Sequence, residues 1–334
     1  MKKLVIWGGN DKTLERENLD SHASVTAYFL TCELRRYYDV VNVTGMDCAR
    51  AILDCDNVWA VLSTFQRGFT NRLIQKGYSK LFQAIRSHVS GPLCSVYDFN
   101  YDDVPYVEDV IFSVRPPSER LTKSIRRRAR NSNIRIIEMG WCADSIECSP
   151  KEKDDDALTI FIDHPPYVAG VRDCTAAYYG AIRRARKTGA RFRVFVQSNL
   201  GVVEVDDTMP LDRHPYERSQ KVPWQEMITR YATTDIFCLT TPQSACLSAM
   251  EAVMCGAKLY VPNDFFGRPF IPRELLTPEI PFETFRPSEA RLADMLCKEA
   301  SRSVVLKTRS EDLVERHSWH LAAQRIHATL NEMK

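Results

Sequence analysis

Short runs of apolar residues alternate with amphipathic stretches along the whole chain. The first run, residues 3–7, reads KLVIW and is followed by Gly8 and Gly9, which is typical of a buried strand that enters a tight turn. Residues 22–38 have apolar positions spaced by three and four, which predicts a helix, and residues 39–45 form another apolar run. A strand, a glycine loop, a helix and a second strand in this order predict a βαβ unit, and therefore a parallel sheet.

The same alternation continues to residue 140. It predicts one doubly wound α/β domain of ordinary size. Further strands are expected at residues 60–65, 92–99, 108–114 and 134–140, and further helices at residues 71–88 and 120–131.

A polar segment then interrupts the pattern. Residues 149–157, SPKEKDDDA, have alanine as their one apolar residue, which favours a linker. Strands and helices alternate again after it. The expected strands are 158–163, 191–197, 235–241 and 257–264, and the expected helices are 174–189, 224–234, 244–256 and 318–334.

Two Rossmann-like domains that face each other across a cleft are the architecture that this pattern predicts. The first would span residues 1–148 and the second residues 158–315. A closing helix within residues 316–334 could cross back to the first domain.

Composition narrows the class of protein. The chain has 334 residues, of which 44% are hydrophobic and 26% charged, with a formal net charge of +2. These values exclude fibrous and largely disordered proteins and a strongly basic nucleic-acid domain. No apolar run approaches the ~18–20 residues of a membrane span, and the run near the start is too short for a signal peptide. The 11 cysteines include no CxxC pair, so we expect a cytoplasmic protein with reduced thiols and no structural metal.

One long segment carries a specific pattern. Residues 222–263 read VPWQEMITRYATTDIFCLTTPQSACLSAMEAVMCGAKLYVPN. This segment resembles the C-terminal domain of glycosyltransferases of the GT-B fold, especially the retaining family 4 enzymes. In that family a helix precedes a strand and a loop of small residues, and the next helix carries a Glu-Ala pair and ends at glycine. The residues in those places are Trp224, Gln225, Glu226, Met227, Tyr231, Asp235, Glu251, Ala252, Cys255 and Gly256.

Three further stretches agree with this resemblance. Residues 136–150 are similar to the family's crossing between domains, and residues 317–323 are similar to its closing helix. The initial strand with Gly8 and Gly9 is similar to its donor-facing first loop. The resemblance implies a metal-independent, retaining transferase that moves a sugar from a nucleotide-sugar, expected to be a UDP-sugar, to a hydroxyl acceptor. It implies no cofactor, with the donor bound by the C-terminal domain and the acceptor by the N-terminal domain.

The resemblance also implies a donor site. Glu251 would accept hydrogen bonds from the ribose hydroxyls; the alternative is a solvated helix charge, although its neighbours are mostly apolar and a bare charge there is costly. Where the family usually has a second glutamate, this chain has Gln243, which would contact the sugar hydroxyls or be an ordinary loop residue. Ser244 would donate to phosphate or cap the next helix.

Positive charge near the diphosphate would come from other segments. The family's Gly-Arg and Lys-Gly residues are absent after the strand at 158–163. Arg172 would replace the diphosphate lysine or be a surface arginine. His164 directly follows that strand and is either a cleft residue or a structural histidine.

The acceptor side has two candidate catalytic residues besides Gln243. Asp98 ends the predicted strand at 92–99 and could orient an acceptor hydroxyl or take its proton; the alternative is an ordinary strand-end cap. His22, placed at the cap of the first helix, could also contact the acceptor.

A basic segment precedes the crossing between domains. It is either a solvated helix face or a contact surface for a polyanionic acceptor, such as DNA, or for an acidic membrane. Transfer to hydroxymethylated bases of viral DNA would fit a short enzyme of this kind and would require the base to be flipped out of the duplex. The six cations of this segment are Arg120, Lys123, Arg126, Arg127, Arg128 and Arg130.

Two other functions remain open. Sugar-nucleotide epimerases share the fold but would need carboxylates near the sugar carbon, and Gln243 argues mildly against them. A non-catalytic sugar-binding or nucleic-acid-binding protein of the same fold is the third reading.

Overall fold

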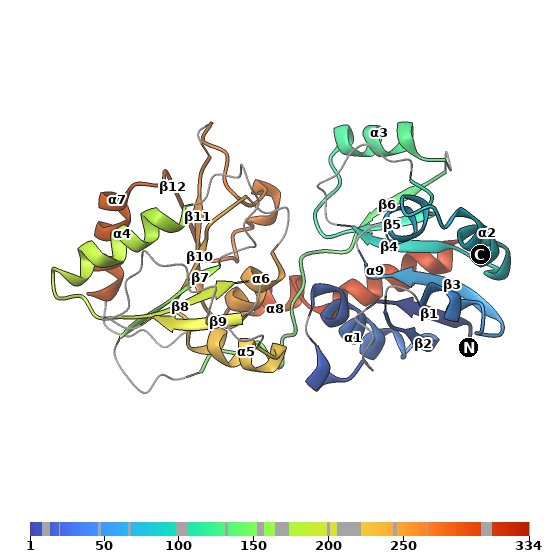
Figure 1. Cartoon of the computed structure of the whole chain (residues 1–334), viewed down its shortest axis with the longest axis horizontal. Coiled ribbons are helices and arrows are strands. Elements are labelled where there is room, and N and C mark those ends of the chain that lie inside the picture. The colour runs from blue at the N-terminus through green and yellow to red at the C-terminus, as the bar shows by residue number, and fades with distance from the viewer. Residues whose placement is uncertain are drawn as a thin grey trace. The chain divides into compact units, whose positions relative to one another are not determined.

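The computed structural model contains two compact units (Figure 1). The first comprises Met1–Cys142 and Arg316–Lys334, and the second comprises Ala143–Glu315. The structure describes residues 1–8, 14–19, 21–45, 48–65, 68–97, 106–130, 133–151, 157–163, 174–198, 201–205, 222–242, 246–264, 266–301 and 309–333. Residues 152–156 of the expected linker are outside this set, so its bounds stay a prediction.

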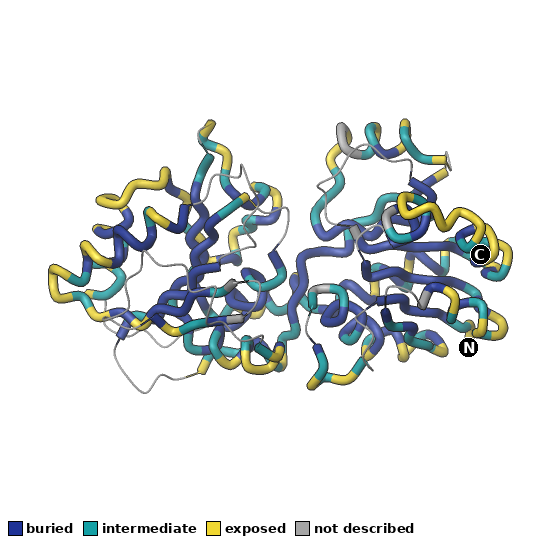
Figure 2. Tube along the Cα trace, viewed as in Figure 1, coloured by how far each residue is buried: buried dark blue, intermediate teal, exposed yellow. Residues whose placement is uncertain are grey.

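Six parallel strands form the sheet of the first unit, in the order β2-β1-β3-β4-β5-β6. The strands are β1 Lys3–Trp7, β2 Asp39–Val43, β3 Val58–Ser63, β4 Leu93–Tyr97, β5 Val110–Ser113 and β6 Arg135–Glu138. The helices are α1 His22–Leu34, α2 Ser79–His88, α3 Glu119–Arg128 and α9 Trp319–Glu332, with the short helical segments η1 Arg16–Asn18, η2 Cys48–Ile52 and η3 Gly68–Ile74. The strands confirm the predicted parallel α/β pattern, and both sheets are buried along most of their length (Figure 2).

The prediction of a single helix at residues 71–88 is wrong. The chain forms a π-helical segment, η3, then a turn, then α2. Gly77 has φ +82° in this turn, a conformation that glycine adopts without a steric penalty and that a continuing helix excludes.

The last helix belongs to the first unit. Trp319 of α9 stacks on Phe29 of α1, with ring centroids 6.0 Å apart and planes 5° from parallel. Near the other end of α9, His327 stacks on Tyr37 at 4.0 Å and lies 3.0 Å from the Tyr38 hydroxyl. Apolar area and ring contacts of this kind fix α9 against α1 and the start of β2.

The second sheet also has six strands, in the order β12-β11-β10-β7-β8-β9. All neighbours are parallel except β9, which is antiparallel to β8. The strands are β7 Leu158–Asp163, β8 Phe192–Ser198, β9 Gly201–Val205, β10 Ile236–Leu239, β11 Lys258–Pro262 and β12 Phe282–Phe285. The helices are α4 Thr175–Arg186, α5 Trp224–Thr233, α6 Leu247–Met254, α7 Glu289–Ala300 and α8 Glu311–Arg316, with η5 Arg273–Leu275. The alternation predicted neither β9, β12 nor α7.

Aromatic residues fill the core of the second unit beside β7. Phe161 stacks on Phe237 of the neighbouring strand at 5.4 Å, and the Tyr231 ring of α5 lies edge-on to Phe161 at 5.0 Å. All three side chains are buried. This packing fixes α5 over the centre of the sheet, which matters for the site described below.

Gly8 joins three elements of the first unit. Its amide donates to the Val43 carbonyl at the end of β2 (3.0 Å), and a Cβ added to it would lie 1.8 Å from the Thr64 hydroxyl oxygen. That hydroxyl donates to the Ala23 carbonyl in the first turn of α1 (2.9 Å). The absence of a side chain at Gly8 therefore lets the end of β1 approach the end of β3 and α1.

We predict that Gly8→Ala lowers the free energy of unfolding by about 1–3 kcal/mol, the usual cost of an overpacked core position. The penalty should be smaller in a Thr64→Ala background, because the closest clashing atom is then gone. Urea unfolding of the four proteins in the double-mutant cycle measures both effects. An equal penalty in both backgrounds would contradict the contact.

Candidate functional site

The carboxyl edge of the second sheet gathers polar groups from several elements. Asp163, the last residue of β7, pairs in register with Leu239 of β10 and is 6% exposed. The Thr240 hydroxyl donates to the Asp163 carbonyl at 2.5 Å, and the Cys246 thiol donates to its carboxylate at 3.5 Å. The chain that leaves β10 for α6 is thus held against the end of β7. Ligands of open α/β sheets bind at this edge.

Glu251 lies inside this edge rather than on a solvated helix face. It occupies the second turn of α6 and is only 4% exposed. The indole Nε1–H of Trp224, at the start of α5, donates to Glu251 Oε1 at 2.6 Å. The helix α6 is apolar on both sides of the glutamate, so its carboxyl depends on this hydrogen bond for polar contact among the described side chains.

Burial changes the charge of Glu251. Its pKa is raised to about 8, chiefly because burial removes hydration; the Trp224 hydrogen bond opposes this shift, and the nearby Asp144 carboxylate adds a smaller rise. The side chain is therefore mostly a neutral carboxylic acid at pH 7. A neutral carboxyl both donates and accepts hydrogen bonds, which suits it to contact a hydroxyl group.

Tyr231 of α5 interacts with strand β8 and lies within the electrostatic influence of Glu251. Its hydroxyl donates to Gln197 Oε1 of β8 at 3.4 Å. Its pKa is raised well above the usual value, chiefly by burial and then by Glu251, whereas a hydrogen bond with the Ser248 side chain acts in the opposite direction. Gln197, Tyr231 and Ser248 therefore form a polar cluster whose charge state is influenced by Glu251, and none of these three is among the predicted site residues.

The remaining predicted donor residues lie outside the described part of the chain. The N-cap of α6 is Cys246, whereas the helix was expected to begin at Ser244. The residues in question are His164, Arg172, Gln243 and Ser244, whose roles stay predictions.

The first unit contributes a second candidate edge. Ser21 is the N-cap of α1, where its hydroxyl accepts from the Ser24 amide at 3.2 Å, and His22 is the first helical residue after it. Gly8 has the packing role described above. Asp98, Gly9 and the His22 side chain are outside the description, so their predicted contacts with substrate stay predictions.

The predicted basic segment forms α3 and the residue after its end. Ile125 is buried and anchors this helix, while Lys123, Arg126, Arg127 and Arg130 are exposed. Lys123 pairs with Glu119 at 2.6 Å, and Arg128 donates to the Ser124 side chain. Arg120 has its backbone in α3, but its side chain is not described. The exposed residues of α3 and its end are therefore largely cations.

Two features are absent from the described residues. No group of three or more His, Cys, Asp or Glu side chains is arranged to hold a metal ion. Among the same residues, no helix has both the length and the apolar character that crossing a bilayer requires.

The chain is similar in fold to several solved structures. No family model and no curated protein matches it. The lipopolysaccharide outer core galactosyltransferase WaaB superposes with a TM-score of 0.53 at 11% identity, covering 99% of both chains. AviGT4, a glycosyltransferase involved in avilamycin A biosynthesis, gives 0.56 at 10% identity, over 99% of this chain and 97% of that one. UDP-GlcNAc 2-epimerase from Neisseria meningitidis, bound to UDP-GlcNAc, gives 0.52 at 11% identity, over 99% and 100%.

These likenesses establish the fold. Each extends over nearly the whole chain, and each is to a glycosyltransferase or to a UDP-GlcNAc epimerase. The chain therefore has the GT-B fold, built from two Rossmann-like units, which confirms the predicted fold class. At about 10% identity the reaction does not follow from the fold.

We predict that Glu251 makes stability depend on pH. Its pKa is about 8 in the folded protein and near 4.5 when unfolded, so between these values the folded state holds a proton that the unfolded chain releases. The free energy of unfolding should then fall as pH rises from about 4.5 to 8, by on the order of a few kcal/mol.

Urea unfolding at several pH values tests this. Glu251→Gln, a neutral residue of the same shape, should lose this part of the slope. Glu226→Gln on α5 is the matched control, because that carboxylate is half exposed and pairs with Arg230. Identical slopes for wild type and Glu251→Gln would refute the assignment.

Proposed function

We propose that this protein is a metal-independent, retaining glycosyltransferase that moves a sugar from a UDP-sugar to a hydroxyl acceptor. The observation that carries the proposal is the buried Glu251 carboxyl, held by Trp224 at the carboxyl edge of a Rossmann-like sheet in a chain of GT-B fold. A carboxyl in an apolar core costs stability. Binding of ribose hydroxyls would explain why the chain has a carboxyl at this buried position despite the cost.

The donor would lie along the edge formed by β7, β10 and α6. The neutral Glu251 carboxyl can accept from one ribose hydroxyl and donate to another. The amide groups at the start of α6 carry partial positive charge, which favours the diphosphate beside them. His164 and Arg172 follow β7 in the chain and Ser244 follows β10, so we expect them near this edge, and Gln243 would contact the sugar.

The reaction exchanges one bond at the anomeric carbon. The bond from that carbon to the β-phosphate oxygen breaks, and the nucleoside diphosphate leaves with the electron pair. The acceptor oxygen bonds to the same face of the carbon, and its proton passes to the departing phosphate oxygen. By the resemblance to family 4 no protein nucleophile is required, and Asp98 or His22 of the first unit would orient the acceptor.

Support for a UDP-sugar comes from the structural neighbours. The Neisseria meningitidis epimerase is bound to UDP-GlcNAc, and a further neighbour, Anabaena HepE, is in complex with UDP and glucose. A cytoplasmic location agrees with the buried thiols of Cys94, Cys142, Cys238 and Cys255, which form no disulfide.

An epimerase is the second candidate, because epimerases are among the structural neighbours. Epimerisation at a C–H centre removes and returns a proton, so it needs a base and an acid beside that carbon. Among the described residues, Asp144 and Asp163 are further carboxylates near α6, and the Asp163 side chain already accepts from Cys246.

A polyanionic acceptor is a third possibility, favoured by the exposed cations on α3. Four arginines lie within residues 126–130 and most are exposed. DNA with hydroxymethylated bases would present both phosphates and a primary hydroxyl. A row of cations of this kind would bind phosphates and leave base choice to the active site.

We predict that UDP and UDP-sugars raise the melting temperature, whereas GDP-, ADP- and CMP-sugars do not. A ligand at a hundredfold excess over its Kd adds about 2.7 kcal/mol, which is roughly 5–10 °C for a unit of this size. Glu251→Ala should abolish the shift, and the exposed Glu226→Gln should keep it. An unchanged shift in Glu251→Ala, or no shift with any nucleotide, would overturn the proposal.

The bound UDP-sugar is then incubated in D2O with candidate acceptors. Transfer gives UDP and a glycoside with the donor's anomeric configuration. An epimerised sugar that carries deuterium at the inverted carbon would identify an epimerase instead. Binding with neither product would identify a non-catalytic sugar-binding protein.

We predict, for the DNA acceptor, that Arg126→Gln/Arg127→Gln weakens duplex binding and reduces the salt slope by up to about 1.8, or about 0.9 per lost phosphate contact. The matched control is Arg291→Gln/Lys298→Gln, which removes two exposed cations from α7. Fluorescence anisotropy over a salt series measures both. Equal slopes in the two double variants would exclude α3 as the contact surface.

A further inference from the structure

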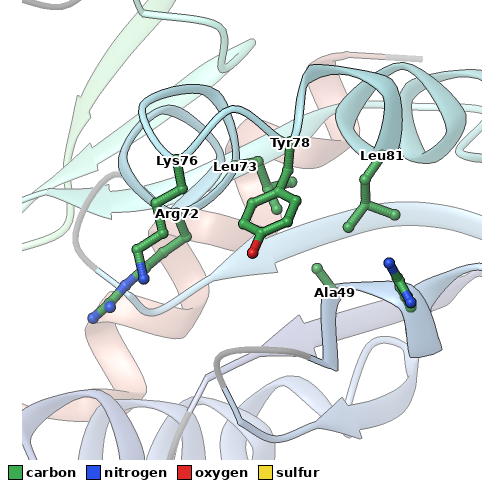
Figure 3. A pocket seen from close by; sticks show the side chains of 7 residues that line it. Ala49, Arg72, Leu73, Lys76, Tyr78 and Leu81 are labelled. Carbon is green, nitrogen blue, oxygen red and sulfur yellow. The ribbon is translucent and has the colours of Figure 1, made fainter.

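A pocket lies wholly within the first unit, apart from the candidate donor site. Its cavity volume is about 220 Å³, and it lies between η2 on one side and the end of η3 with the start of α2 on the other (Figure 3). We call it the η2–η3 pocket. Its lining residues are Ala49, Arg50, Arg72, Leu73, Lys76, Tyr78 and Leu81.

The floor of the η2–η3 pocket is apolar and fixed. Ala49 and Leu73 are 1% and 2% exposed and belong to the core that contains Val5 and Trp7 of β1. The wall that carries Lys76 is a closed turn, because the Tyr78 amide donates to the Leu73 carbonyl at 2.8 Å. The pocket is therefore formed before any ligand arrives, which reduces the entropic cost of binding.

The rim of the pocket is strongly positive. Arg50, Arg72 and Lys76 contribute three cations, and none of the lining residues that the structure describes is a carboxylate. The Arg72 guanidinium lies over the Phe65 ring, 5.1 Å from its centroid, which restricts where it can point. In Figure 3 Arg72 and Lys76 extend in the same direction from one segment, so their two positive charges add to the attraction for an anion on that side.

Tyr78 adds an aromatic surface. Its side chain is 49% exposed, unlike most large apolar residues of the unit, and Figure 3 shows its hydroxyl directed toward the side of Ala49. A planar group could lie against the ring while the hydroxyl donates to an anion. The pocket thus has a small apolar floor, an aromatic wall and a cationic rim. These features suit an anion that also has a planar part.

We propose that the η2–η3 pocket binds a small phosphate monoester with a planar organic group. A monoester carries a charge of about −1.5 to −2 at pH 7, which matches three cations better than a carboxylate does. Arginine forms paired hydrogen bonds with phosphate oxygens, and the pocket offers two arginines from different elements. The volume is below the ~300 Å³ of sites for drug-sized ligands, so the ligand is small.

Phenyl phosphate is the probe for this proposal, measured by calorimetric titration of the full chain at low salt. We expect saturable binding that weakens about tenfold or more in Arg72→Gln/Lys76→Gln, because each charge-assisted contact with phosphate is strong. Arg50→Gln, on the opposite wall, should weaken it as well. Arg35→Gln/Arg36→Gln is the matched control, since it removes two exposed cations of the same unit outside the pocket, and it should change the affinity less than about twofold.

Three further binding measurements define which ligand the pocket prefers and where it binds. Inorganic phosphate should bind more weakly than phenyl phosphate, and benzoate more weakly still. A saturating UDP-sugar should leave the affinity for phenyl phosphate unchanged, because it has no phosphate monoester and the candidate donor site belongs to the other unit. Tyr78→Leu should reduce the preference for phenyl over inorganic phosphate while its melting temperature stays near that of wild type.

Several outcomes would overturn the proposal. They are the absence of saturable binding, equal affinity in wild type and both pocket variants, and displacement of phenyl phosphate by a UDP-sugar. Because all the substituted side chains lie at the surface or the rim, an unchanged melting temperature shows that a lost affinity reflects the pocket and not unfolding. The test stands apart from the transferase proposal, since phenyl phosphate binding requires no sugar donor.

Discussion

The hydrogen bond between Trp224 and Glu251 is the constraint on which the second unit depends. The carboxyl belongs to a mostly apolar helix, α6, and its donor is the first residue of α5. The sheet explains why the pair can form: Phe161 and Phe237 hold the Tyr231 ring, so α5 lies where its first turn reaches α6. A shift of either helix would leave a buried carboxyl without its donor, a cost of several kcal/mol if the group stayed charged. The fold of this unit and the chemistry of its edge are thus parts of one arrangement.

The order of strands and helices could be predicted because parallel strands buried on both faces read as apolar runs between amphipathic helices. The elements that escaped prediction lack that signal. β9 is an outer strand of five residues that begins at glycine, and η3 and α2 share an apolar pattern which only the left-handed Gly77 divides. Local patterning cannot tell a broken helix from a continuous one when the break depends on one dihedral angle.

The candidate site was predictable in part. The apolar neighbours of Glu251 indicated burial, and the structure agrees. Its partner could not be found in this way, because Trp224 is 27 residues away and the contact arises from helix packing. Ser248 and Gln197 were missed for the same reason, since each looks like an ordinary residue within its own element, and Tyr231 matched the family's pattern without a role in the site. Sequence spacing identifies a residue that needs a partner, whereas only the packing of elements identifies the partner.

The return of α9 to α1 has a consequence for how the protein is made. The second unit is one continuous piece of chain, whereas the first is assembled from residues at both ends. During synthesis the second unit can finish folding as soon as residue 315 has emerged, but the first unit must wait for its final helix. Until then the surface around Phe29 lacks the Trp319 ring that covers it. The half of the chain that is synthesised first is therefore the half that is completed last.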